Sequence, residues 1–175
     1  VYDAVSGATP LSAWKFDHQL TALPDLAFGL TSGSTGETSA ALILLGGVYL
    51  AVRNMMNWRI PVAIFVAVAM LSGFLHVVDA ERFASPVFML LSGGLMLGAV
   101  FMASDMVASP MTSPGCVVYG VFIGMVVVVI RTWGGMPEGV MYAILLGNAL
   151  SPHIDGLIRP KVYGTGRRSR AGGSA

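Results

Sequence analysis

Charged residues divide this chain into five long uncharged runs, at residues 38–52, 60–78, 83–104, 106–130 and 139–154. A helix that crosses a lipid bilayer needs about 20 mainly apolar residues, within a range of roughly 17–25. The three middle runs reach this length, and the outer two reach it when a terminal acidic residue is included, namely Glu37, Glu138 or Asp155. The pattern predicts an all-α integral membrane protein with about five spans, at residues 36–53, 59–78, 85–104, 114–132 and 138–157.

A less regular stretch precedes the first run. Between Val1 and Leu11 no apolar period is sustained, and Gly7 and Pro10 interrupt the chain, which predicts a loop. Apolar residues then recur every three or four positions, at Ala13, Phe16, Leu20, Leu23 and Ala27. This spacing, interrupted at Pro24, predicts a short amphipathic helix on the membrane surface. Packing of the same helix on a partner domain is the alternative.

A polar, glycine-rich segment at residues 30–39 leads into the first apolar run. Ser34 or Thr35 can cap a helix that starts there. Glu37, directly after Gly36, falls in the first turn and complements the positive end of the helix dipole. Because the free N–H groups at a helix start favour anions, one interpretation is a contact to phosphate or to a reduced flavin. The other is a capped helix that enters the membrane.

Glycine pairs four residues apart mark places where helices can touch closely, at Gly94 with Gly98 and at Gly120 with Gly124. Such pairs support a packed bundle and carry no chemistry by themselves.

Composition supports the membrane assignment. Hydrophobic residues make up 55% of the 175 residues and charged residues only 11%, against roughly 25% charged in soluble domains. A formal net charge of +1 gives no basic face for nucleic acid. With Cys116 as its single cysteine, the chain can form neither an internal disulfide nor a multi-cysteine metal site alone. Cys116 itself lies in an apolar run and is predicted to be a core residue.

The distribution of lysine and arginine predicts the orientation. With a cytoplasmic C-terminus, the inside segments carry seven basic residues, at Arg53, Arg59, Arg159, Lys161, Arg167, Arg168 and Arg170. The outside segments carry Lys15, Arg82 and Arg131. Cytoplasmic loops are enriched in Lys and Arg, so the start of the chain is expected outside. Residues 159–175 are predicted to be a basic, disordered cytoplasmic tail.

Ionisable residues at membrane depth are costly and are candidates for function. Asp105 ends the third predicted span and is followed by prolines and hydroxyl residues, which suggests either an ion path or a structured cytoplasmic turn. Glu37 and Glu138 are the other candidates for an ion path. His76 is predicted to bond a neighbouring carbonyl, and His153 falls on the opposite membrane side, so no metal site is expected.

Four stretches in order resemble one family, the D subunit of the Rnf electron-transport complex and its relative, the B subunit of the sodium-pumping NADH:quinone oxidoreductase. They are Asp3-Ala-Val-Ser6-Gly7-Ala8-Thr9-Pro-Leu, Gly33-Ser-Thr-Gly-Glu-Thr-Ser39, Phe101-Met-Ala-Ser-Asp105 with Ser109-Pro-Met-Thr112, and Gly134-Gly-Met-Pro-Glu-Gly139. The resemblance covers nearly the whole chain except the tail.

This resemblance implies a covalent cofactor. In the family, the threonine of Ser-Gly-Ala-Thr carries FMN through a phosphoester, installed by a flavin transferase that reads an Asp three residues before the Ser. The matching positions are Thr9 as the attachment point and Asp3, Ser6, Gly7 and Ala8 as the attachment motif. Residues 1–30 would then be an attachment loop and amphipathic segment, and residues 31–158 the membrane domain.

The resemblance further implies a subunit of an ion-translocating oxidoreductase with no activity of its own. It would pass electrons between other Rnf-type subunits in a bacterial or archaeal cytoplasmic (inner) membrane, coupled to sodium or proton transport. The Ser34 to Glu37 helix start is the local candidate for a further flavin contact. A quinone-reducing B-type subunit and a cofactor-free transporter subunit are the alternatives. Since the chain begins at Val1 without a leader pattern, we expect the C-terminal part of a longer subunit.

Overall fold

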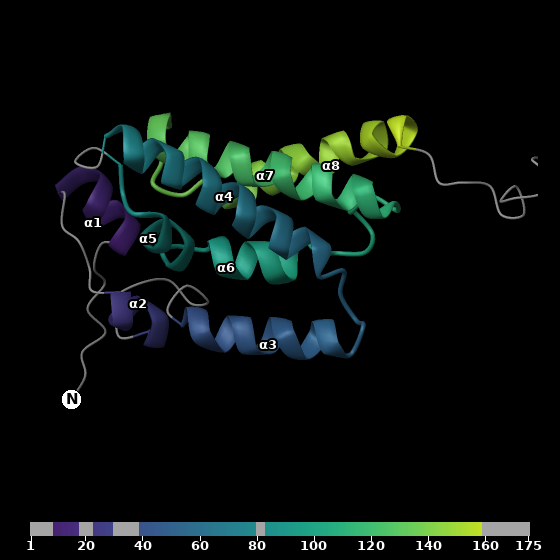
Figure 1. The fold of residues 1–175 in the computed structure, drawn as a ribbon, viewed down its shortest axis with the longest axis horizontal. Helices are drawn as coiled ribbons and strands as arrows, with labels where there is room; N and C mark the ends of the chain where they lie inside the picture. Colours follow the sequence, from purple (N-terminus) through teal and green to yellow (C-terminus); the bar gives the residue numbers. More distant parts are fainter. Residues whose placement is uncertain (1–8, 18–22, 30–38, 80–82, 159–175) are drawn as a thin grey trace, which may run out of the picture.

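The computed structural model describes residues 9–17, 23–29, 39–79 and 83–158, and every regular element in these ranges is helical. The all-α prediction is therefore confirmed for the described part of the chain. In order along the chain (Figure 1), the elements are α1 (Pro10–Asp17), α2 (Leu23–Phe28), α3 (Ala40–Val52), α4 (Arg59–Val78), α5 (Pro86–Leu91), α6 (Leu95–Leu97), the π-helix η1 (Gly98–Met102), α7 (Ser113–Trp133) and α8 (Val140–Leu157).

The two longest helices, α4 and α7, form the centre of the bundle because glycines let them approach closely. A Cβ added at Gly120 would lie 2.7 Å from the Cβ of Ala63, and one added at Gly124 would lie 2.7 Å from the Cβ of Ala67. Neither position has room for a side chain, so the α7 glycines lie directly against α4. The predicted helix contact at Gly120 and Gly124 is confirmed.

The other elements surround this pair. α8 packs on α7, and α5 packs on α4. Gly98, the second glycine of the other predicted pair, lies against α8, since an added Cβ there would clash with Val140. Between α7 and α8, the Tyr119 hydroxyl donates a hydrogen bond to Oδ1 of Asn148. Lipid tails are as apolar as helix surfaces, so there is little hydrophobic driving force between helices in a membrane. Hydrogen bonds between helices therefore add to the stability that packing provides.

The third predicted span is not one helix. Residues 85–104 contain α5, α6 and η1, and the break falls at residues 92–94. Gly93 there has φ 70°, a conformation that glycine adopts at no steric cost. Beyond the break, the Ala103 N–H donates to the Gly98 carbonyl at 2.7 Å, the i to i+5 bond of a π-helix. The expectation of a single helix at 85–104 was wrong. The backbone groups at the break bond side chains from distant parts of the chain, and the sequence pattern does not show these contacts.

Among the described residues, α4 and α7 are the two helices that are long and apolar enough to cross a membrane. α3 is apolar but has 13 residues, with residues 36–38 of the expected span outside the described part. α8 has 18 residues and contains Pro152. Helices occupy parts of all five predicted intervals, and α4, α7 and α8 lie close to the predicted bounds. The number of membrane spans stays a prediction.

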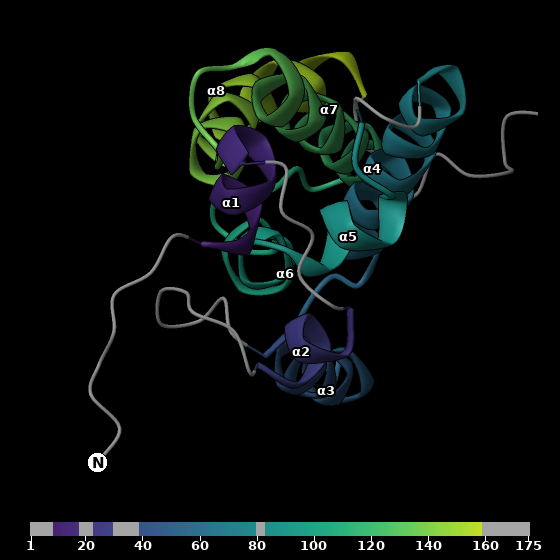
Figure 2. The same cartoon turned by 90° about the vertical axis from the view of Figure 1, so that its left-hand side faces the viewer.

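The N-terminal region forms two short helices where one was expected. The predicted loop ends at Thr9, because Pro10 already begins α1. Proline is favoured at the first helical position, where its missing N–H leaves no bond unmade. The expected single helix over residues 13–27 is divided between α1 and α2, with residues 18–22 outside the described part. α2 packs against α3, as Figure 2 shows, and also against α5.

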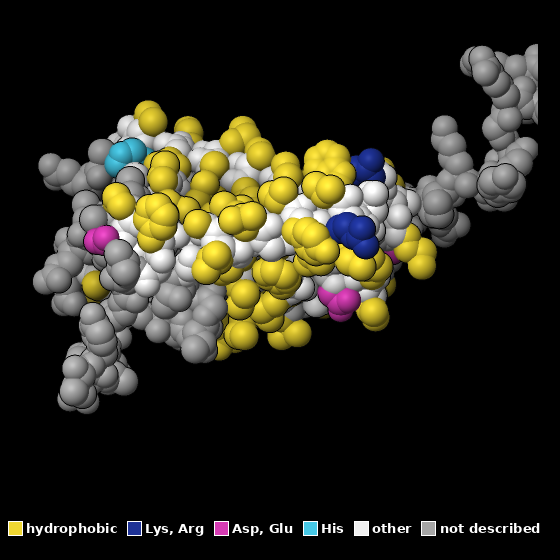
Figure 3. All heavy atoms as spheres, turned by 90° about the horizontal axis from the view of Figure 1, so that it is seen from below, with side chains coloured by type: hydrophobic (Ala, Val, Ile, Leu, Met, Phe, Trp, Pro, Cys, Tyr) yellow, Lys and Arg dark blue, Asp and Glu magenta, His cyan; other side chains and the backbone are white. Residues whose placement is uncertain are grey.

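Large apolar side chains cover the outside of the bundle. Exposed examples come from α3, α4, α7 and α8, and include Leu45, Met70, Phe74, Val129 and Leu145. Figure 3 shows hydrophobic side chains over most of one face, with the Lys and Arg side chains on that face near one end. Soluble monomers rarely expose such large continuous apolar patches. Together with the two spanning-length helices, this surface is that of a membrane protein.

The contact between α4 and α7 gives a prediction. Gly124→Ala in the full-length membrane protein should lower the free energy of unfolding by about 1–3 kcal/mol, because its Cβ would overlap Ala67 and the Ile64 carbonyl. Thermal unfolding in detergent measures the change. Gly156→Ala on α8, where an added Cβ meets nothing within 4 Å, is the matched control and should not lower stability. Equal losses in the two variants would contradict the proposed close contact.

Candidate functional site

Thr9 is the first described residue and lies at the start of α1. Its side-chain Oγ1 accepts a hydrogen bond from the Ser12 N–H at 3.4 Å, and its carbonyl accepts from the Ala13 N–H at 2.9 Å. Thr9 is thus the N-cap of α1, a position that favours Ser, Thr, Asp and Asn. The other residues of the attachment motif, Asp3, Ser6, Gly7 and Ala8, lie outside the described residues.

Lys15 connects α1 to the C-terminal end of α7. Its Nζ donates to the carbonyl oxygens of Arg131 at 3.0 Å and Met136 at 2.9 Å, and also to that of Gly134. An ammonium has three N–H donors, so these three carbonyls use all of them. Burial lowers the pKa of Lys15 below its ordinary value of 10.5. Because three carbonyls accept from Lys15, three N–H donors are needed, and only the charged form has three. The positive charge also lies near the negative end of the α7 helix dipole.

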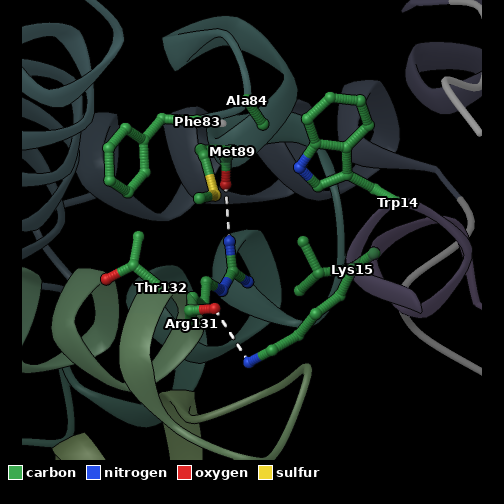
Figure 4. Close-up of a pocket in the computed structure, with 8 residues that line it drawn as sticks. Trp14, Lys15, Phe83, Ala84, Met89, Arg131 and Thr132 are labelled. Atoms are coloured by element: carbon green, nitrogen blue, oxygen red, sulfur yellow. Dashed lines mark hydrogen bonds between the residues drawn. The ribbon is translucent and has the colours of Figure 1, made fainter. Parts of the chain in front are cut away.

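A pocket of about 200 Å³ lies between α1, the start of α5 and the end of α7. In the view of Figure 4, Trp14 and Phe83 lie on opposite sides of it, with Met89 and Arg131 between them. The pocket combines aromatic and aliphatic walls with two cationic side chains. Its lining residues are Leu11, Trp14, Lys15, Phe83, Ala84, Met89, Arg131 and Thr132.

Neighbouring contacts hold the walls of this pocket. Trp14 lies against Phe88 of α5 with ring centroids 6.1 Å apart, and Phe83 lies against Trp133 of α7 at 6.3 Å. His76 on α4 bonds the Phe83 carbonyl through Nδ1 at 2.8 Å. This is the histidine-to-carbonyl contact predicted from the sequence. No group of three potential metal ligands occurs in the described residues.

Arg131 bridges α7 to the broken third span. It is 4% exposed, and its guanidinium donates to the carbonyls of Met89 at 2.6 Å and Ser92 at 3.1 Å. These are carbonyls at the C-terminal end of α5, which have no partner within the helix. Arg131 falls inside the span predicted at 114–132 but was counted among the charges of the outside segments. Its contact with carbonyls 42 and 39 positions earlier was not predicted, because no local pattern indicates it.

Glu138, a predicted ion-path residue, lies at the same break. Its Oε1 accepts from the Gly94 N–H at 3.3 Å. A Cβ at Gly93 would lie 2.5 Å from that oxygen and 3.0 Å from Nη2 of Arg131, so both side chains close around Gly93. Glu138 therefore has a structural role beside α6. Whether it also lies on an ion path stays a prediction.

Asp105 lies near the opposite end of the bundle, in the connection after η1. Its Oδ1 accepts from the Val107 N–H at 3.3 Å, and its carbonyl accepts from the Ser109 N–H at 3.1 Å. These bonds describe a structured turn. The exposed Asp105 also borders a cavity of about 350 Å³. Its other lining residues are Val100, Phe101, Ser104 and Met106 from the same segment, Leu50 from the end of α3, and Met55 and Met56 from the connection after α3.

The structure does not bring the remaining predicted residues into the site. Ser34, Thr35, Gly36 and Glu37 lie outside the described residues. Cys116 is buried in the core, as predicted, where it accepts from Asn57 and donates to the Pro110 carbonyl. Thr9, Lys15, Arg131 and Glu138 thus gather at one end of the bundle, and Asp105 lies at the other.

Comparison with known proteins gives the family. The profile of the NQR2, RnfD, RnfE family matches residues 1–164. The chain belongs to this family. It is 39% identical to the D subunit of the ion-translocating oxidoreductase complex of Stutzerimonas stutzeri, with 96% of this chain and 51% of the relative aligned.

Relatives described with different transported ions are about equally similar. The chain is 40% identical to the D subunit of the proton-translocating ferredoxin:NAD(+) oxidoreductase complex of Clostridium ljungdahlii (94% of this chain, 53% of the relative). It is 37% identical to the Na(+)-translocating counterpart of Acetobacterium woodii (93% and 50%). The chain thus spans about half the length of the curated relatives that it matches.

The local structure fits the flavin that the resemblance implies. A phosphodiester on Thr9 would place a negative charge at the N-terminus of the eight-residue α1, where the helix dipole favours anions. Lys15 adds a positive charge on the same helix. The residues present are therefore compatible with a phosphate-linked group at Thr9.

The Arg131 contacts give a second prediction. Arg131→Met in the full-length protein should lower the free energy of unfolding by about 2–6 kcal/mol, because two buried carbonyls lose their donor at about 1–3 kcal/mol each. Arg59→Met removes an exposed arginine bonded to Ser113 and should change stability by about 1 kcal/mol or less. Thermal unfolding of both variants in detergent measures the difference. A loss no greater in Arg131→Met than in Arg59→Met would contradict the bridging role.

Proposed function

We propose that this chain is part of a D-type subunit of an ion-translocating ferredoxin:NAD oxidoreductase and carries FMN on Thr9. The observation that carries the proposal is the motif Asp3 to Thr9, which places the hydroxyl of Thr9 directly before α1. The names of the relatives supply the reaction class, since the similar subunits from Clostridium ljungdahlii and Acetobacterium woodii are named for ferredoxin:NAD(+) oxidoreductases.

The proposed attachment is a phosphoryl-type transfer. The Thr9 oxygen replaces the AMP part of FAD at the flavin phosphate, so the pyrophosphate bond breaks, a phosphoester forms and AMP leaves with the hydroxyl proton. Gly7 and Ala8 are small residues, which leave room beside Thr9 for the active site of a transferase. When bound, the flavin supplies one- and two-electron transfer, and the chain holds it in place beside the membrane.

The orientation belongs to the same proposal. Lys15 and the α7–α8 connection lie at one end of the bundle, and Arg53 and Arg59 lie at the other. By the positive-inside rule the Arg53 and Arg59 end faces the cytoplasm. Thr9 then lies on the extracytoplasmic side of a bacterial or archaeal inner membrane, where neighbouring Rnf-type subunits would exchange electrons with it.

Removal of the hydroxyl tests the attachment. In the intact complex made together with its flavin transferase, Thr9→Val should abolish the fluorescent flavin band of the denatured subunit in a gel. Ser12→Ala is the matched control, since it removes the next hydroxyl of α1 and should leave the band unchanged. Persistence of the band in Thr9→Val would show that the flavin is attached elsewhere.

A cofactor-free transporter subunit is the second candidate. The observation in its favour is the interrupted third span, because broken helices in membrane transporters often form substrate or ion sites. Absence of any covalent flavin from the native complex would favour this candidate over the first.

The ion route is proposed to involve Asp105, which borders the cavity near the end of α3. Asp105→Asn should lower ion transport in sealed vesicles about tenfold, the effect of about 1.4 kcal/mol of lost attraction for a cation. The flavin band should stay unchanged, because Thr9 lies at the other end. Asp79→Asn, an exposed acidic residue after α4, is the control. Unchanged transport in Asp105→Asn would remove Asp105 from the route.

A further inference from the structure

We propose that the pocket between Trp14 and Phe83 receives the isoalloxazine ring of the flavin on Thr9, with Lys15 as a fixed positive charge beside it. This inference rests on the proposed attachment at Thr9 and assigns the ring a place that the attachment motif does not specify. The first reason is reach. Along α1, Trp14 lies roughly 7.5 Å from Thr9, at 1.5 Å of rise per residue, a distance that a ribityl phosphate chain can span.

The second reason is size. The pocket has a volume of about 200 Å³, below the roughly 300–1,000 Å³ of pockets that enclose whole small molecules. It would therefore take the flat ring and leave the ribityl phosphate outside, along α1. This division suits a cofactor whose phosphate is already fixed to the chain at Thr9.

The third reason is the chemistry of the walls. An aromatic side chain lies at each end of the pocket, Trp14 from α1 and Phe83 from the segment before α5 (Figure 4). Each of them contacts a further ring, Phe88 and Trp133 respectively, neither of which lines the pocket. Fixed aromatic walls favour a planar conjugated ring, because offset or edge contacts between aromatic groups add to the burial of apolar area.

Lys15 gives the pocket its electrostatic character. Its three donors are all used by the carbonyls of residues 131, 134 and 136, so it cannot turn toward a ligand. It acts instead as a charge held at the pocket wall. A reduced flavin carries more negative charge than an oxidised one, and a nearby cation favours the reduced ring.

Fluorescence of the intact native complex tests the pocket. The signal of this flavin is isolated as the difference between each complex and the same complex with Thr9→Val. Trp14→Leu and Phe83→Leu should each lower the equilibrium constant for docking about fivefold, the loss that corresponds to about 1 kcal/mol of ring contact. The difference emission should then rise, because the ring leaves its quenching neighbours. Phe16→Leu, which changes an exposed ring on α1 that does not line the pocket, should have no effect.

The same samples distinguish attachment of the flavin to Thr9 from docking of its ring in the pocket. The flavin band of the denatured subunit reports attachment, and the native difference emission reports docking. A normal band with unchanged emission in both pocket variants overturns the pocket and leaves the Thr9 attachment intact. A missing band in the unaltered complex overturns the attachment, and the pocket assignment with it.

Potentiometric titration tests the role of Lys15. Lys15→Met should shift the midpoint potential of the Thr9-linked flavin to a more negative value, with about a tenfold lower ratio of reduced to oxidised flavin at a fixed potential. Lys15→Arg keeps the charge and should restore the potential. An unchanged potential in Lys15→Met, or an equal shift in both variants, overturns the electrostatic role.

Discussion

The break at residues 92–94 depends on one constraint, that buried backbone polar groups need hydrogen-bond partners within the protein. Arg131 supplies donors to the carbonyls of Met89 and Ser92, and Glu138 accepts from the N–H of Gly94. Both partners come from α7 and its connection to α8. The two charged side chains thereby connect α7 and its link to α8 with the segment between α5 and α6.

The same end of the bundle supports the candidate flavin site. Lys15 binds the carbonyls of Arg131 and of the residues that follow it, and Trp14 packs on α5 shortly before the break. α1 thereby binds the end of α7, which Arg131 in turn connects to α5. A cofactor tethered to Thr9 would need such a fixed position, because electron transfer to a neighbouring subunit depends on where its ring is held. The ion-path candidate Asp105 lies at the other end of the bundle.

Sequence reasoning succeeded where a feature depends on neighbours along the chain. The apolar runs located α4 and α7, and glycine spacing located their contact at Gly120 and Gly124. It failed where the outcome depends on distant residues. The span expected at 85–104 is interrupted by a break whose backbone partners lie on α7 and its connection to α8. Lys15 was counted only as a charge of the outside segments, whereas it binds carbonyls more than a hundred positions away. The loop expected up to Leu11 is helical from Pro10, which is an error at an element boundary, since its cause, the Thr9 cap, is local.

By itself, the sequence determined the helical class, the membrane setting, the family resemblance and Thr9 as the attachment candidate. These follow from composition, period and a short motif, all of which are local. Only the tertiary structure decided that Lys15, Arg131 and Phe83 line one pocket and that Glu138 lies beside Gly94. The physical reason is that a buried charge is stable only where distant backbone groups happen to meet it, and no local pattern records that meeting.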